Sequence, residues 1–151
     1  MAKRYRLGMG RRIVNALVRA LLRVGVGPAR TYLLVTRGRT TGRVYRTPVT
    51  LVEDGPRRWL VAPYGEVAWV TNARASRQVV LERGRRSETQ RLHELQPRDS
   101  APILRRYVRE VPITRPYFDA TPDATLEAFA AEAARHPVFE LLPEESGGAP
   151  R

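Results

Sequence analysis

The stretch from Thr36 to Arg43 gathers side chains that bind anions within one loop. It reads Thr-Arg-Gly-Arg-Thr-Thr-Gly-Arg, and Arg46 and Pro48 follow it. Two glycines four residues apart let a strand-to-strand turn curl so that several backbone N–H groups point the same way. Threonine hydroxyls and guanidinium groups add donors that fit phosphate or carboxylate. The loop is a candidate anion site, but the same residues would also form an ordinary solvated turn, and alone they leave both interpretations open.

Other common chemistries lack their residues. The chain has no cysteine and only two histidines, His93 and His136, without the spacing of metal ligands. The loop is not a phosphate-binding loop of the Walker type, because the Gly-Lys-Ser/Thr ending and the following helix are missing. We therefore expect neither a metal site nor a cysteine nucleophile.

The net charge of +12 is distributed unevenly along the 151 residues. Residues 1–52 contain one lysine, eleven arginines and no acid, whereas residues 53–151 contain fifteen arginines and fifteen acids. The whole excess charge therefore belongs to the first third of the chain. Such asymmetry indicates an anionic partner, which could be nucleic acid, a lipid surface or a phosphorylated small molecule.

Short segments rich in Val, Leu, Thr and Tyr follow this loop and precede it. They predict strands at Thr31–Arg37, Val44–Val52, Arg58–Pro63, Gln78–Arg83, Ser87–Leu95 and Val138–Leu142. The Asp54-Gly55 step predicts a hairpin between the second and third strands. Because the strands do not alternate regularly with helices, we expect an antiparallel barrel with helices outside it, an α+β fold.

Helices are predicted between and after these strands. One covers Trp69–Ala75, one covers Ala101–Glu110 with Asp99 as its cap, and one runs from Thr121-Pro122 to about Arg135. Residues 111–121 contain two prolines, a third follows at Pro122, and the segment is predicted to be a loop.

Residues 11–25 predict a further, amphipathic helix with apolar residues at helical spacing and arginines on the other side. It could pack across one end of the barrel or lie on an anionic membrane surface. No stretch approaches the roughly 18 apolar residues of a spanning helix, and no convincing export signal is present. We expect a cytoplasmic protein, with peripheral contact to the inner face of the cell membrane as an open alternative.

Four motifs occur in an order that is recognisable. They are Gly38-Arg39-Thr40-Thr41-Gly42, Arg46-Thr47-Pro48-Val49, Val61-Ala62-Pro63-Tyr64-Gly65 and Trp69-Val70-Thr71-Asn72-Ala73-Arg74-Ala75, with His136-Pro137-Val138-Phe139 completing the set. Over about residues 10–142 the chain resembles the deazaflavin-dependent nitroreductase family of actinobacteria, which are split β-barrel proteins related to flavin-binding oxidoreductases. We therefore expect a split-barrel domain over residues 30–143. The residue pattern predicts a basic amphipathic N-terminal helix within residues 1–29 and a frayed tail at 144–151.

The resemblance also implies a cofactor, coenzyme F-420, which carries a phosphate and an oligoglutamate tail at one end of a flat ring. By analogy with the family, the tail end would be held by a basic set of residues: Arg39, Thr40, Thr41, Gly42, Arg46 and Arg74. The ring would be lined by a second set: Pro48, Ala62, Pro63, Tyr64 and Gly65. Trp69 would form a wall of the pocket, and Asn72 would hydrogen-bond the cofactor or fix its loop. Flavin mononucleotide is the alternative cofactor.

The function implied is hydride transfer from reduced F-420 to a quinone, an activated alkene or a nitro compound. The protein would position the cofactor and shield it from water. Tyr64 and Tyr117 are candidate proton donors, because a phenol can hydrogen-bond a developing oxyanion. The tyrosine-rich segment that lines the acceptor pocket in the family has no clear match, and only Tyr117-Phe118 lies in a comparable region.

Three alternatives remain at this point. A nucleic-acid-binding barrel fits the isoelectric point of about 11.3, but the strands lack paired exposed aromatic residues, and aromatics are only 7% of the chain. The chain could also bind a deazaflavin or flavin without turnover, or act at a membrane surface through residues 11–25. Monomer and homodimer are equally compatible with the sequence.

Overall fold

The computed structural model describes residues 17, 19 and 29–144. Six strands form a closed barrel: β1 (Thr31–Arg37), β2 (Val44–Asp54), β3 (Arg57–Val61), β4 (Gln78–Arg83), β5 (Arg86–Glu94) and β6 (Val138–Pro143). Their order around the barrel is β1-β2-β3-β6-β5-β4, and every neighbouring pair is antiparallel. The predicted antiparallel barrel in an α+β fold is confirmed.

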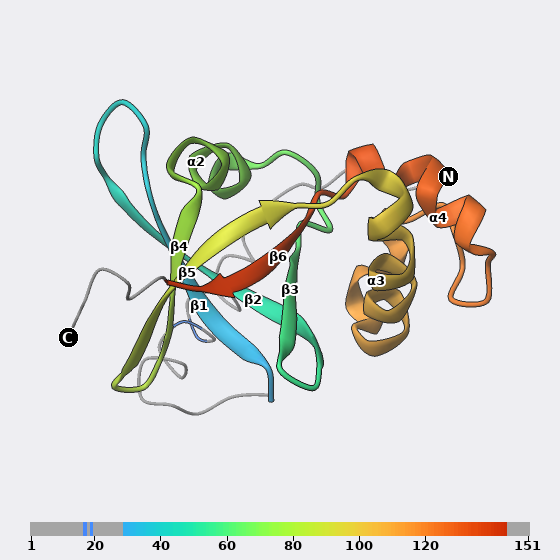
Figure 1. The fold of residues 1–151 in the computed structure, drawn as a ribbon, viewed down its shortest axis with the longest axis horizontal. Helices are drawn as coiled ribbons and strands as arrows, with labels where there is room; N and C mark the ends of the chain where they lie inside the picture. The colour runs from blue at the N-terminus through green and yellow to red at the C-terminus, as the bar shows by residue number, and fades with distance from the viewer. Residues whose placement is uncertain (1–16, 18, 20–28, 145–151) are drawn as a thin grey trace.

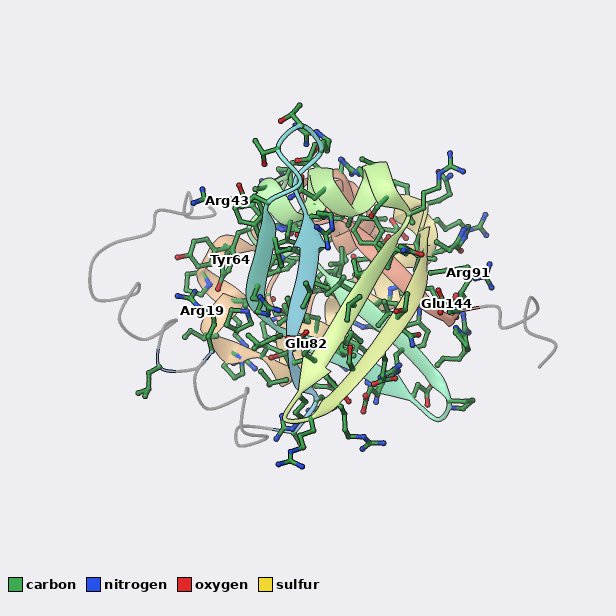
Figure 2. The ribbon with its side chains drawn as sticks, turned by 90° about the vertical axis from the view of Figure 1, so that its left-hand side faces the viewer. Arg19, Arg43, Tyr64, Glu82, Arg91 and Glu144 are labelled. Atoms are coloured by element: carbon green, nitrogen blue, oxygen red, sulfur yellow. The ribbon has the colours of Figure 1, made fainter. Side chains whose placement is uncertain are left out.

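Three hairpins set the register of the barrel. The β2–β3 hairpin pairs Asp54 with Arg57 around a tight turn whose Gly55 has a φ of 61°, as the Asp-Gly step predicts. The long β1–β2 hairpin, which contains the arginine-rich loop, projects from one end of the barrel (Figure 1). The β4–β5 hairpin projects from the other end (Figure 2).

The barrel interior is filled by alternate strand residues and closed by the short helix α2 (Ala68–Ser76). Leu34, Leu51, Leu60, Leu81 and Phe139 are almost fully buried there. Trp69 and Val70 of α2 join the same cluster. Along each strand, the residues of this cluster alternate with outward-facing residues, because successive side chains on a strand point to opposite faces.

A second apolar layer lies outside the barrel, between β3 and a helical unit (Figure 1). The unit consists of α3 (Pro97–Glu110), the 3-10 helix η1 (Pro112–Tyr117), α4 (Leu126–Glu132) and the 3-10 helix η2 (Ala133–Arg135). Trp59 and Val61 of β3 pack there against Leu104, Val108 and Phe129. Burial of this apolar face holds the helices on one side of the barrel.

The helix ends differ from the sequence predictions. Helix α3 begins at Pro97 with Gln96 as the N-cap, and Asp99 lies within its first turn. The prediction of Asp99 as the cap is wrong because proline at the first helical position starts the helix earlier. The prediction of a start at Thr121-Pro122 is also wrong: Thr125 is the N-cap of α4, and its hydroxyl accepts a hydrogen bond from the Ala128 N–H at 3.2 Å.

Two further predictions concern residues 111–121 and residues 11–25. Within the predicted loop at residues 111–121, Pro112–Tyr117 form a 3-10 helix, which suits prolines better than an α-helix does. The predicted helix over residues 11–25 lies outside the described residues except for Leu17 and Arg19. The division of the chain at residues 29 and 143 stays a prediction.

Candidate functional site

A cavity of about 420 Å³ opens between the barrel and its helical layer. One wall is formed by β2, from Tyr45 to Thr50, and the floor comes from the end of β3 and the start of α2. The opposite wall comes from α3, the residue after it, and η1. The remaining lining residues are Arg19, Val61, Pro63, Tyr64, Val67, Ala68, Trp69, Tyr107, Val111, Ile113 and Thr114.

Five residues predicted for the site line this cavity: Arg46, Pro48, Pro63, Tyr64 and Trp69. They come from β2, the β3–α2 loop and α2, so the barrel brings together three separate motifs of the sequence. The Arg46 guanidinium is already engaged, because its Nε donates to Glu82 Oε1 at 3.1 Å. Proline, tryptophan and tyrosine side chains give the cavity the apolar and aromatic character that is typical of cofactor sites.

The arginine-rich loop stands beside the cavity rather than in its lining. Arg39, Thr40, Thr41 and Gly42 are exposed at the tip of the β1–β2 hairpin. The tip is closed by its own bonds, since the Gly42 N–H donates to the Gly38 carbonyl at 3.0 Å and the Arg43 N–H donates to Thr41 Oγ1 at 3.1 Å. Gly42 has a φ of 71°, which favours glycine.

The hairpin and the cavity nevertheless face the same way. Figure 2 shows Arg43 at the hairpin, Tyr64 at the cavity and Arg19 along one edge of the molecule. A ligand that fills the cavity could therefore extend an anionic end toward the hairpin arginines.

The other predicted site residues are placed elsewhere. Ala62 and Asn72 are buried and do not line the cavity. Gly65, with a φ of 88°, turns the chain between β3 and α2, and a side chain there would lie 3.5 Å from the Arg135 carbonyl. Arg74 forms salt bridges with Glu66 at 2.6 Å and with Glu94 at 2.7 Å, which neutralise it on another surface.

The two predicted proton donors lie side by side but differ in access to the cavity. The Tyr64 and Tyr117 rings meet edge to face with centroids 4.8 Å apart. Tyr64 lines the cavity, whereas Tyr117 packs behind it, is 9% exposed and is absent from the lining.

A third tyrosine, Tyr107 of α3, lines the cavity and was not predicted for the site. Burial raises the pKa of its phenol, nearby Tyr64 raises it further, and a hydrogen bond with the Thr114 side chain lowers it. Tyr107 is therefore a neutral hydroxyl in the wall formed by the helical layer. Tyr107 lies within the predicted helix Ala101–Glu110, and nothing in its sequence surroundings indicated a cavity.

Two exposed apolar residues stand at the mouth of the cavity and were also missed. Tyr45 is 39% exposed and Ile113 is 66% exposed, and both line the cavity. Exposed apolar groups beside a cavity indicate an apolar ligand that covers them. The alternation of Tyr45, Thr47 and Val49 along one strand was the available signal.

Comparison with protein families decides the identity. Residues 9–124 match the model of the family described as F420H(2)-dependent quinone reductase. The chain belongs to this family. Its members' activity makes the chain an oxidoreductase that uses coenzyme F-420, and the acceptor class is quinone-like. The predicted resemblance to deazaflavin-dependent reductases is confirmed.

Solved structures share the fold of this quinone reductase family member. An F420-H2 dependent reductase (FDR-A) has a TM-score of 0.54 and 19% identity, over 77% of this chain and 96% of that one. A putative pyridoxamine 5'-phosphate oxidase from Listeria innocua has a TM-score of 0.53 and 11% identity, over 87% and 94%. The Atu2129 protein of unknown function from Agrobacterium tumefaciens has a TM-score of 0.57 and 15% identity, over 85% of this chain and 54% of its own length. The likeness supports the split β-barrel fold.

Two further searches gave a negative result. A search of curated proteins finds no match. Among the described residues, no helix is long and apolar enough to cross a membrane.

The residues present fit the family's cofactor. The cavity is lined by the apolar side chains of Pro48, Val49 and Trp69, which suit a flat ring, and by Thr47, which suits a polar ring edge. The positively charged hairpin lies on the same side of the molecule (Figure 2). A ligand that is flat and apolar at one end and anionic at the other matches this arrangement.

Proposed function

We propose that this chain transfers a hydride from reduced coenzyme F-420 to a quinone, and that both bind in the cavity between β2 and the α3–η1 wall. The observation that carries the proposal is the single cavity that joins three motifs of the F-420 family to an apolar wall with exposed Tyr45 and Ile113. Reduced F-420 supplies the hydride when bound.

The chain itself contributes position and exclusion of water. Pro48 of β2 and Trp69 of α2 both line the cavity and would position a flat ring there. Tyr45 and Ile113 would cover the acceptor, and an isoprenoid quinone would bury both side chains.

Charge favours the cofactor's tail at the hairpin. Arg37, Arg39 and Arg43 are exposed there. In the described part of the chain, no acid forms a salt bridge with these three guanidinium groups. They would bind the phosphate or the carboxylates of the tail through charge-assisted hydrogen bonds.

The proton that completes the quinol must reach one of its oxygens. Tyr64 is our proposed proton donor because it lines the cavity. Tyr107 supplies a second neutral hydroxyl nearby. The choice of quinone over a nitro compound or an activated alkene rests on the family and on the exposed apolar mouth.

Fluorescence titration with oxidised F-420, with flavin mononucleotide as competitor, tests the cofactor. We expect saturable binding of F-420 that excess flavin mononucleotide does not displace. Displacement at equal concentrations would favour the flavin alternative. Binding of single-stranded DNA with a steep salt dependence, without F-420 binding, would favour the nucleic-acid alternative.

A further inference from the structure

Glu132 and His136 form a buried pair behind the cavity. Each is 3% exposed, and His136 Nε2 lies 3.0 Å from Glu132 Oε1. His136 Nδ1 lies 2.9 Å from the carbonyl oxygen of Pro63. Because a proline carbonyl can only accept, Nδ1 carries a hydrogen and donates it to Pro63. The ring is thereby held through both of its nitrogens.

The carboxylate of Glu132 also holds a second segment of the chain. Its Oε1 accepts a hydrogen bond from the Asp119 N–H at 3.0 Å, and its Oε2 accepts one from the Ala120 N–H at 2.6 Å. The ring of Phe118 stacks on the imidazole of His136 with centroids 3.9 Å apart. The pair therefore ties residues 118–120 to the carbonyl of Pro63.

Both arms of this network end at Tyr64. On one side, Pro63 precedes Tyr64 in the wall of the cavity. On the other side, Tyr117 precedes Phe118, and its ring meets the Tyr64 ring edge to face at 4.8 Å. Neither Glu132 nor His136 lines the cavity.

Burial of this ionisable pair has a cost in free energy. Two ionisable side chains lose their hydration here, and well-packed apolar residues of similar volume would stabilise the fold as well or better. Burial lowers the pKa of His136, whereas its hydrogen bonds to Glu132 and Pro63 raise it. Arg135, 3.7 Å from Glu132 Oε1 and paired with Asp119 at 2.8 Å, is the charged group beside the pair. Directed hydrogen bonds are what an apolar pair could not provide.

We propose that Glu132 and His136 are positioning residues that fix Tyr64 at the cavity, with His136 holding the Pro63 carbonyl and Glu132 holding the segment that carries Tyr117. The proposal deepens the proposed function, on which its ligand-binding consequence rests. The positioning itself is a property of the chain without ligand.

Two conservative variants of His136 separate the arms. Asparagine places an amide nitrogen near the position of Nδ1 and can donate to Pro63, whereas glutamine reaches the position of Nε2 and faces Glu132. Hydrogen exchange at the Gly65 and Val67 amides reports on the wall, because these amides donate to the Ala62 and Gly65 carbonyls at 3.4 and 2.9 Å. The Leu81 amide in β4 serves as the control for global stability.

We expect His136→Gln to speed exchange at Gly65 and Val67 by about tenfold, and His136→Asn to keep it within about threefold of the wild type. Leu81 should exchange alike in both variants. Equal acceleration by the two variants, or none in His136→Gln, would overturn the proposal. If His136→Gln does not fold, Glu132→Gln replaces it: acceleration at Gly65 is expected, and unchanged exchange there would overturn the proposal.

Titration with oxidised F-420 extends the test to the ligand. His136→Gln should weaken binding by about tenfold and His136→Asn by no more than about threefold. Equal affinity of the two variants would contradict the link from Tyr64 to the ligand. If the wild type itself fails to bind F-420, the proposed function is lost, whereas the exchange rates still decide the positioning role.

Discussion

Tyr64 and Tyr117 meet edge to face at 79°, and only Tyr64 reaches the cavity. Their hydroxyls therefore have unequal access to a bound acceptor, although the sequence made both candidate donors. Tyr64→Phe keeps the ring contact and removes one hydroxyl, and we expect kcat/KM for a quinone to fall about tenfold.

Tyr117→Phe is the matched control, since the ring contact with Tyr64 survives while the second hydroxyl is lost. Steady-state kinetics should show kcat/KM within about twofold of the wild type. A larger loss in Tyr117→Phe than in Tyr64→Phe would reverse the assignment of the donor.

The hairpin arginines provide a second prediction. Arg39→Ala removes an exposed guanidinium at the β1–β2 tip, and we expect the Kd of oxidised F-420 to rise about tenfold at low salt through the loss of charge-assisted hydrogen bonds. Arg85→Ala removes an exposed arginine from the β4–β5 hairpin at the other end of the barrel (Figure 2) and should leave the Kd unchanged. Equal losses in the two variants would reduce the effect to net charge.

Strand positions could be predicted well from the sequence, and helix starts could not. β1 and β4 have the bounds that were predicted, because turn residues flank short β-branched segments at both sites. The caps of α3 and α4 were misplaced because Asp99 and Thr121 are good caps in isolation. Pro97 and Thr125 are also favourable residues at a helix start. Tertiary packing decides between Pro97 and Asp99 for α3, and between Thr125 and Thr121 for α4.

The residues of the candidate site were likewise predicted only in part. Arg46, Pro48, Pro63, Tyr64 and Trp69 were predicted from motifs and do line the cavity. Tyr107 was missed because helical periodicity shows which side of a helix faces inward, not where a cavity interrupts the packing. Thr114 was missed because residues 111–121 were predicted to be a loop. In the Glu132–His136–Pro63 network, Glu132 and His136 are neighbours in sequence, but Pro63 lies 73 residues from His136, so local spacing could not predict the contact.

A third prediction concerns the layer that carries the cavity's outer wall. Phe129 of α4 is fully buried between α3 and the barrel, so Phe129→Ala should lower the free energy of unfolding by about 3 to 5 kcal/mol. Leu126→Ala in the same helix removes a side chain that is 41% exposed and should cost less than about 1 kcal/mol. Urea denaturation measures both values, and similar losses would contradict the packing of α4.

The buried imidazole predicts a pH dependence of stability. Burial lowers the pKa of His136 below the ordinary 6.5, so the unfolded chain binds a proton more readily as the pH falls. The contribution of His136 is therefore fully present above about pH 6.5 and decreases as the pH falls through the folded-state pKa. Between about pH 7 and pH 5, the free energy of unfolding should fall more steeply in the wild type than in His136→Asn. Parallel curves would show that His136 does not contribute.

The central claim is that this chain catalyses the oxidation of reduced F-420 by a quinone, which is itself reduced to the quinol. The direct measurement is the oxidation of reduced F-420 under anaerobic conditions, with and without a soluble quinone. The recovery of F-420 absorbance and fluorescence monitors the reaction. We predict that one F-420 is oxidised for each quinone reduced, only when protein and quinone are both present. Oxidation that is independent of the quinone, or none at all with F-420 bound, would contradict the account.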